Sequence, residues 1–199
     1  MPSDSKTLPR CFFANPDVVS VSRSLLGKVL CTDIDGQFTS SIITETEAYC
    51  GRGDKACHAY NGKYTERTKI MYGPPGTAYI YLCYGIHHLF NVVTNKEGLA
   101  DAVLIRGVKP LAGYDVMIER RGMTNSKQLT NGPGKLTQAM GITTDYNSCD
   151  LLKPPIWIED HHYSFHDHQI ETSKRVGIDY AEEDTDKPWR FIIPHSILT

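Results

Sequence analysis

The sequence predicts an α+β fold, with a single domain spanning residues 1–199. We expect a curved, mainly antiparallel and partly barrel-like β-sheet, short peripheral helices and a protruding β-hairpin. A chain of 199 residues is long enough for one well-packed core. Segments rich in Val, Ile, Thr and Tyr are separated by turn dipeptides, which is typical of antiparallel hairpins. The helical segments are short and end at glycine.

The composition excludes several classes of protein. Hydrophobic residues make up 40% of the chain and charged residues 22%, and no apolar run approaches the roughly 20 residues that would span a bilayer. The polar start lacks the apolar core of a secretory signal, so we expect a cytoplasmic, nuclear or nucleoid-associated protein with free thiols and flexible residues 1–10. Because the formal net charge is -2, any surface that binds nucleic acid must be local.

The first half of the chain predicts one helix and two strands. Asn15-Pro16-Asp17 supplies an N-cap and a proline at the first helical position, and the helix should end at Gly27. Strands over residues 28–34 and 37–49 follow. They are joined by Asp35-Gly36, a dipeptide that suits a two-residue hairpin turn.

A long loop and a second hairpin come next. The glycine-rich segment 50–76 has no regular pattern, and a loop of this length in a compact domain is more often functional than idle. Residues 77–94 predict two strands with a turn at Tyr84-Gly85-Ile86, and residues 102–108 predict another strand. The remaining chain predicts helices over 111–121 and 136–140, ended by Gly122 and Gly141, and strands over 155–159, 174–178 and 189–194.

The stretch T-E-T-E-A-Y, residues 44–49, is the strongest candidate for chemistry. Side chains alternate along a strand, so Glu45, Glu47 and Tyr49 share one face. Two acids on one face repel each other unless water, a cation or a proton held by one of them offsets the charge. A solvated face or a salt-bridged edge strand would explain the pair without chemistry.

Two features that could bind an anion accompany this stretch. Arg106 is the one charge within an apolar strand, and a semi-buried arginine needs an anion, for which Glu45 and Glu47 are the nearest candidates. A purely structural pair of Arg106 with Glu45 remains open. The glycine-rich turn 131–135 leads into a helix and could hold a phosphate through backbone N–H groups, although Gly-Pro-Gly is also common turn punctuation.

A series of motifs runs in order along the chain: I-I-T-E-T-E-A-Y, D-K-A-C-H, P-G-T-A-Y-I-Y-L-C-Y-G, F-N, L-I-R, G-P-G-K-L, R-V-G-I and K-P-W-R-F. In this order they resemble the alkyladenine (3-methyladenine or alkylpurine) DNA glycosylase family of the vertebrate type. The resemblance implies a single DNA glycosylase domain that flips a damaged purine out of duplex DNA and hydrolyses its N-glycosidic bond. It implies no metal or cofactor, no membrane, no obligatory protein partner and a monomer.

Carried over residue by residue, the resemblance gives the pocket its expected roles. Glu47 would be the general base that activates the attacking water. Arg106 would help to hold that water and the nearby phosphate. Tyr49, His58 and Tyr81 would stack the extruded base, with His58 also hydrogen-bonding to it.

The resemblance also implies contacts around the pocket and with DNA. Asn91 would line the pocket floor and disfavour guanine by crowding its exocyclic amine. Tyr84 would fill the gap left in the base stack, and Lys135 would contact a phosphate. The family's turn presents two bulky residues after Tyr-Gly, and here they are Ile86 and His87, which leaves the minor-groove contacts open.

The residue chemistry agrees with such a reaction. An O-glycoside hydrolase needs an acid and a second carboxylate, whereas an alkylated purine already carries positive charge and leaves without much proton donation. Glu47 alone could then suffice, and Glu45 is surplus. Stacking on aromatic faces contributes about 1 to 3 kcal/mol per base, and electron-poor purines should stack best on tyrosine. We therefore expect a preference for cationic or distorted purines. The lesions that the resemblance implies are 3-methyladenine, 7-methylguanine, hypoxanthine and ethenoadenine-like bases.

Several residues have a purely structural alternative. Tyr81 could belong to the core, Asn91 could satisfy backbone groups near a turn, and Tyr84 could pack on its own hairpin. Cys57-His58 invites a thiol-enzyme interpretation, but adjacent strand residues point to opposite faces. A histidine cluster has spacing that could suit a metal, but no acidic or cysteine framework fixes its geometry, so a solvated loop is favoured. Its members are His161, His162, His166 and His168.

Two other functions remain alternatives. One is a hydrolase of small nucleosides or sugars that uses Glu45 and Glu47. The other is a non-catalytic module that binds DNA lesions and retains the pocket.

Overall fold

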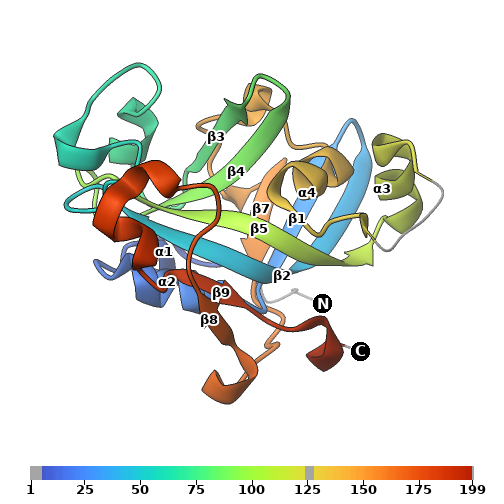
Figure 1. Ribbon diagram of the computed structural model, residues 1–199. Helices are drawn as coiled ribbons and strands as arrows, with labels where there is room; N and C mark the ends of the chain where they lie inside the picture. The colour runs from blue at the N-terminus through green and yellow to red at the C-terminus, as the bar shows by residue number, and fades with distance from the viewer. Residues whose placement is uncertain (1–5, 124–127, 199) are drawn as a thin grey trace.

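The computed structural model describes residues 6–123 and 128–198. Within them, nine antiparallel strands form one curled sheet, a half-barrel with a few short helices around it (Figure 1). This confirms the predicted α+β class and the curved antiparallel sheet. The strands are β1 (Val29–Ile34), β2 (Gln37–Cys50), β3 (Ala78–Cys83), β4 (His87–Thr94), β5 (Asp101–Ala112), β6 (Leu152–Lys153), β7 (Ile156–Glu159), β8 (Glu171–Ser173) and β9 (Arg190–Ile192). The α-helices are α1 (Arg10–Phe13), α2 (Val18–Ser24), α3 (Tyr114–Arg121) and α4 (Pro133–Met140).

β2 lies at the centre of the sheet. The strand order is β3-β4-β5-β2-β1-β7-β6, with β9 beside β2 and β8 beside β9. One edge of β2 pairs with β5, and the other edge pairs first with β1 and then with β9. Register shifts lie on both sides of Glu45, and such irregularities bend a strand. Because the acidic stretch is paired on both edges, the edge-strand alternative is wrong, and because Glu47 has no exposed area, the solvated-face alternative is wrong for it as well.

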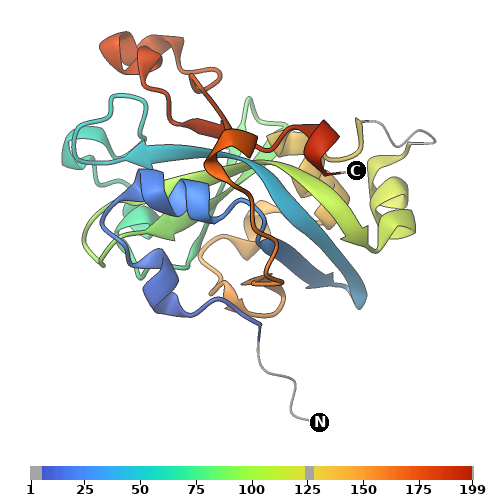
Figure 2. The ribbon, with the colours of Figure 1, turned by 90° about the horizontal axis from the view of Figure 1, so that it is seen from below.

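The two faces of the sheet carry separate apolar clusters. The main core joins one face, including Ile80, Phe90 and Val103, to α1, α2 and α4, and Figure 2 shows α1 and α2 lying across the sheet. On the opposite face, segment 51–76 packs down and forms a smaller cluster that includes Tyr79. The predicted functional loop therefore covers the face that does not carry the main core.

The first predicted helix begins later than expected. α2 starts at Val18, and its N-cap is Asp17, whose carboxylate accepts the backbone N–H groups of Val19 and Ser20 at 3.0 and 3.2 Å. The expected cap, Asn15, lies before the helix. A side chain that satisfies two free N–H groups at once fixes the helix start at Asp17.

Two later helices also differ at their starts. α3 begins at Tyr114 and not at Leu111, because β5 continues as far as Ala112. α4 begins at Pro133 and not at Leu136, since proline is well accommodated in a first helical turn. No helix in the described part of the chain is long and apolar enough to cross a membrane.

The predicted strand over residues 174–178 is wrong, and the strand in this region is β8, which ends at residue 173. Beyond β8 the backbone bonds to side chains and not to a neighbouring strand. The N–H of Val176 donates to the Glu47 carboxylate at 2.8 Å, and the Arg175 side chain is buried. The segment is held by polar contacts with distant residues, so its sequence carries no hydrophobic alternation from which its conformation could be predicted.

The start of the described chain is attached to the sheet. Thr7 forms an isolated bridge with Glu159, and Leu8 is buried with its N–H bonded to the carbonyl of Ile158 at 2.9 Å. Of the segment expected to be flexible, residues 1–5 lie outside the described residues.

A buried ion pair joins the C-terminal part of the chain to loop 51–76. Arg175 donates to both carboxylate oxygens of Asp54, at 2.5 and 2.7 Å, and neither side chain has exposed area. Arg175 also donates to the carbonyl of Ala48 in β2 at 2.9 Å. Removing one partner would leave a buried charge without its counter-ion, which is far more costly than losing a surface pair.

We predict that Arg175→Ala lowers the free energy of unfolding by about 3 to 5 kcal/mol. Urea unfolding followed by circular dichroism measures the change. Lys174→Ala is the matched control, because the pair of Lys174 with Asp186 is 67% and 75% exposed. That control should change the free energy by less than about 1 kcal/mol. Equal effects of the two substitutions would contradict the prediction.

Candidate active site

The register of the sheet aligns one row of side chains across four strands. The row consists of Tyr79 in β3, Asn91 in β4, Leu104 in β5 and Glu47 in β2. Directly paired residues of antiparallel strands project to the same face. The hydrogen-bonding pattern alone therefore brings the carboxylate, an amide and an aromatic ring onto the face covered by loop 51–76.

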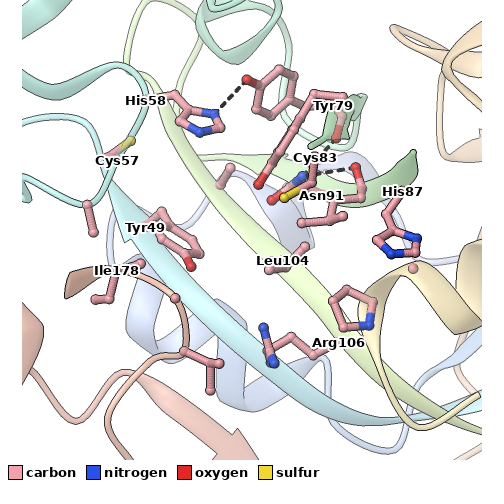
Figure 3. A pocket seen from close by; sticks show the side chains of 18 of the residues that line it. Tyr49, Cys57, His58, Tyr79, Cys83, His87, Asn91, Leu104, Arg106 and Ile178 are labelled. Atoms are coloured by element: carbon pink, nitrogen blue, oxygen red, sulfur yellow. Dashed lines mark hydrogen bonds between the residues drawn. The ribbon is translucent and has the colours of Figure 1, made fainter. Parts of the chain in front are cut away.

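A cavity of about 420 Å³ opens on this face. That volume lies within the range of small-molecule sites. In Figure 3, Tyr49 and Ile178 lie on one side of the cavity, and Asn91 and His87 lie on the other. The predicted site residues that line it are Tyr49, His58, Tyr81, Tyr84, His87, Asn91, Arg106 and Lys135.

Glu47 lies directly behind the cavity wall and has no exposed area. Its Oε2 accepts the hydroxyl of Tyr49 at 2.7 Å, and its Oε1 accepts the N–H of Val176 at 2.8 Å. The Nε of Arg106 lies 3.4 Å from Oε1. Tyr49, Val176 and Arg106 all line the cavity. The groups that contact the carboxylate are therefore also groups of the cavity wall.

Burial raises the pKa of Glu47, and the positive charge of Arg106 is the largest influence that lowers it again, followed by the hydrogen bonds from Tyr49 and Val176. Burial and the neighbouring carboxylate also raise the pKa of Tyr49 well above its usual value. Tyr49 therefore stays protonated, and its hydroxyl donates a hydrogen bond to Glu47. The charge of Arg106 and the two hydrogen bonds favour the ionised form of Glu47, and burial opposes it.

Arg106 contacts both acids of the T-E-T-E-A-Y stretch. Its Nε donates to Glu45 at 2.9 Å in addition to its 3.4 Å approach to Glu47. Arg190 in β9 donates to the same Glu45 oxygen at 2.7 Å. Glu45 is therefore not surplus, because it holds two arginines beside the buried carboxylate. The structural pair of Arg106 with Glu45 and the contact of Arg106 with Glu47 exist together.

His58 belongs to an aromatic cluster on the cavity wall. Its Nδ1 is 2.9 Å from the hydroxyl of Tyr79, and its ring meets that of Tyr81 edge to face at 4.7 Å. Burial, and then the charges of Arg67 and Lys63, lower the pKa of His58 to about 4. The imidazole is therefore neutral at neutral pH, and each ring nitrogen can take part in a hydrogen bond.

Asn91 is held in the cavity lining by backbone contacts. Its Nδ2 donates to the carbonyls of Tyr79 and Leu89, at 3.0 and 3.4 Å. The expectation that Asn91 satisfies backbone groups is thus confirmed for the amide nitrogen. The residue nevertheless lines the cavity, so both interpretations apply to it.

The tip of the β3–β4 hairpin stands out from the domain (Figure 1). Tyr84 is 91% exposed and Ile86 71% exposed, so the alternative that Tyr84 packs on its own hairpin is wrong. Tyr84 has a φ of 52°, a left-handed conformation that non-glycine residues rarely adopt. A strained, exposed aromatic at a tip is a candidate for a functional contact.

The hairpin rests against the start of α4. A Cβ on Gly134 would lie 3.0 Å from the His87 side chain, a tight contact that favours glycine at this position. Lys135 donates to Gln128 and Asn131 at 3.0 and 3.1 Å. Its ammonium group is therefore positioned at the rim of the cavity.

Three functional features were missed from the sequence. The N–H of Val176 holds Glu47, Ile178 and Tyr180 line the cavity, and Tyr79 binds His58. The R-V-G-I motif at residues 175–178 was a signal for the first of these, although it was interpreted as a strand. Tyr79 could have been found from its alternation with Tyr81 along β3.

The structure bears on two alternatives, a thiol enzyme that uses Cys57 and a metal site in the histidine cluster. Burial raises the pKa of Cys57 to about 12, which keeps its thiol protonated and unreactive. His161 binds Glu159 at 2.7 Å, and the rings of His166 and His168 stack on each other. Among residues 6–123 and 128–198, no group of three or more His, Cys, Asp or Glu side chains could hold a metal ion.

Comparison with known proteins gives a consistent result. The family model for methylpurine-DNA glycosylases matches residues 11–197. A Chlamydia abortus protein, provisionally named 3-methyladenine DNA glycosylase, is 50% identical over 188 residues, which cover 94% of this chain and 97% of the relative. An Alkaliphilus oremlandii protein with the same provisional name is 49% identical over 194 residues, covering 94% of this chain and 95% of the relative. The chain therefore belongs to the methylpurine-DNA glycosylase family and is a DNA glycosylase, a hydrolase of DNA repair.

Proposed function

We propose that the protein initiates base excision repair by flipping damaged purines out of duplex DNA and hydrolysing their N-glycosidic bonds with a water activated by Glu47. The lesions would be 3-methyladenine, 7-methylguanine, hypoxanthine and ethenoadenine-like bases. The observation that carries the proposal is the buried Glu47 carboxylate, held by Tyr49, Val176 and Arg106 immediately behind an aromatic cavity.

The cavity supplies the base-binding groups that such a reaction needs. Tyr49 would stack on one face of the purine, and His58 and Tyr81 would contact the other. Because His58 is neutral, it can exchange a hydrogen bond with the base without repelling a cationic purine. Asn91 on the floor would crowd the exocyclic amine of guanine. Stacking on aromatic rings contributes about 1 to 3 kcal/mol per base. A poorly paired base costs least to remove from the duplex stack, so it is favoured before any bond is cut.

Glu47 retains the capacity to bind a water. A carboxylate offers about four lone-pair sites, and Glu47 accepts hydrogen bonds from Tyr49 and Val176, which leaves capacity for a water. A water bound there and by Arg106 would face the sugar carbon of a nucleotide whose base occupies the cavity. Glu47 would accept the water's proton as the water oxygen bonds to the oxocarbenium-like sugar carbon and the bond from that carbon to the purine nitrogen breaks. A cationic alkylpurine would leave as a neutral base, whereas a neutral purine such as hypoxanthine would leave as an anion that takes a proton from water.

The exposed hairpin would serve duplex DNA. Tyr84 would enter the gap left by the flipped base, and Ile86 and His87 would lie in the groove beside it. Lys135 would bind a phosphate at the cavity rim. One such wedge suffices for one lesion, so we propose that the protein acts as a monomer without an obligatory partner. A hydrolase of free nucleosides would have no use for a strained tyrosine that is 91% exposed.

We predict that Glu47→Gln lowers base release by roughly 100- to 10,000-fold, because glutamine cannot accept the water's proton. Single-turnover release of hypoxanthine from a duplex oligonucleotide measures the loss, and a gel-shift assay should show that binding persists. Glu66→Gln, whose side chain is 91% exposed, is the control and should act like the unmodified protein. Equal activity of the unmodified protein on free nucleosides would favour the nucleoside hydrolase. Binding without release by the unmodified protein would favour a non-catalytic module.

We predict that Tyr84→Ala slows base release from duplex DNA by roughly 5- to 150-fold, the equivalent of one stacking contact. The same lesion in single-stranded DNA should be released at a nearly unchanged rate, because no gap in a base stack then needs filling. Tyr64→Ala is the control, since Tyr64 is also exposed, at 68%, but lies off the hairpin. Equal loss on both substrates would show that Tyr84 does not act as a wedge.

We predict that Arg106→Met moves the acidic limb of the pH–rate profile to higher pH. Glu47 must be ionised to act as a base, so the rate falls as the pH drops through its pKa. The charge of Arg106 lowers that pKa, and its removal leaves the effect of burial less opposed. Single-turnover rates between pH 5 and 8 measure the shift, with the exposed Lys153→Met as control. An unchanged limb would mean that Glu47 does not set it.

A further inference from the structure

Arg67 places a positive charge against the aromatic wall of the cavity, and no function considered so far includes it. Its guanidinium carbon lies 4.6 Å from the centre of the Tyr81 ring, and its Nη2 lies 3.4 Å from the Nε2 of His58. His58 and Tyr81 line the cavity, whereas Arg67 is an exposed residue outside the lining. The arginine therefore packs over one of the rings on which a purine would stack.

The position of Arg67 is fixed by its neighbours in loop 51–76. Thr68, the next residue, is buried and donates to the carbonyl of Lys63 at 2.7 Å. The hydroxyl of Thr68 also accepts the N–H of Thr65 at 2.9 Å. Met71 is buried in the smaller apolar cluster a few residues further on. These contacts hold the backbone on both sides of Arg67, so its guanidinium is presented to the ring by an ordered loop.

The charge of Arg67 is not neutralised within the described part of the chain. No carboxylate there lies within ion-pair distance of its guanidinium, whereas Arg106, Arg175 and Lys69 each have an acidic partner. The same charge contributes to the lowered pKa of His58. The aromatic wall is therefore under the influence of one uncompensated positive charge.

A cation on a tyrosine ring changes what that ring can bind. The negative face of an aromatic ring attracts cations, and the guanidinium already uses this attraction on Tyr81. A purine with a formal positive charge would gain less binding free energy from the Tyr81 ring, and the charge of Arg67 near that ring would repel it. A neutral purine would stack without that repulsion.

We propose that Arg67 is a specificity-determining residue that shifts the pocket towards neutral damaged purines and away from cationic ones. The inference rests on the proposed stacking of lesion bases in this cavity. It makes hypoxanthine and ethenoadenine-like bases the favoured class, and it opposes the general preference of electron-rich tyrosines for cationic alkylpurines.

The test compares two lesions in otherwise identical duplexes, cationic 7-methylguanine and neutral hypoxanthine. Single-turnover release is measured at saturating protein, and the ratio of the two rates is compared between variants. Arg67→Gln keeps a planar, hydrogen-bonding side chain and removes the charge, so it should raise the ratio of 7-methylguanine to hypoxanthine release by roughly 3- to 30-fold. Arg67→Lys keeps the charge and should leave the ratio within about twofold of the unmodified protein.

Lys69→Gln is the matched control, because it removes one positive charge from the same loop at a residue paired with Glu66 and not with a ring. It should leave the ratio unchanged. An equal loss of both activities in Arg67→Gln would identify Arg67 as a phosphate contact and overturn the inference, as would an unchanged ratio. Failure of the unmodified protein to release either base would instead overturn the proposed function on which the inference rests.

Discussion

The burial of one carboxylate constrains much of this structure. An ionised glutamate without exposed area is costly unless donors surround it. The groups that stabilise Glu47 come from three separate parts of the chain: the donors are the hydroxyl of Tyr49 in β2 and the N–H of Val176 beyond β8, and the ion-pair partner is Arg106 in β5. The C-terminal segment must therefore return across the sheet to complete the site. The ion pair of Arg175 with Asp54 fixes that return one residue before Val176.

The presence of Glu45, the second acid of the T-E-T-E-A-Y stretch, is explained by the same constraint. Arg106 contacts the buried carboxylate, and Arg190 is paired with Glu47 across β2 and β9, so two arginines meet in this part of the sheet and would repel each other without a further anion. Glu45 accepts from both, at 2.9 and 2.7 Å, and remains 17% exposed, so it neutralises them at a lower desolvation cost than Glu47 bears. The register shifts around Glu45 accompany this arrangement in the most heavily paired part of β2.

Local patterns in the sequence predicted much of the fold and the centre of the site. Alternation placed Glu45, Glu47 and Tyr49 on one face, and turn residues located both hairpins, because each signal depends only on adjacent residues. The same reasoning could not find Val176, whose contribution is a backbone N–H, or Arg175, whose partner is remote in sequence. It extended α3 too early because an apolar strand end and a helical turn look alike over three or four residues.

The electrostatics of the site explain why a net charge of -2 does not conflict with a function on DNA. The net charge predicts that any surface for nucleic acid is local. The structure nevertheless places acids close to the cavity. Tyr180, which lines the cavity, is followed by Glu182 and Glu183, but both of these acids bind Lys55. Arg106 is likewise engaged by glutamates, whereas Arg67 has no acidic partner among the described residues. Internal pairing therefore engages Arg106, Glu182 and Glu183 near the cavity, and the proposed selectivity rests on Arg67, a cation without such a partner in the described chain.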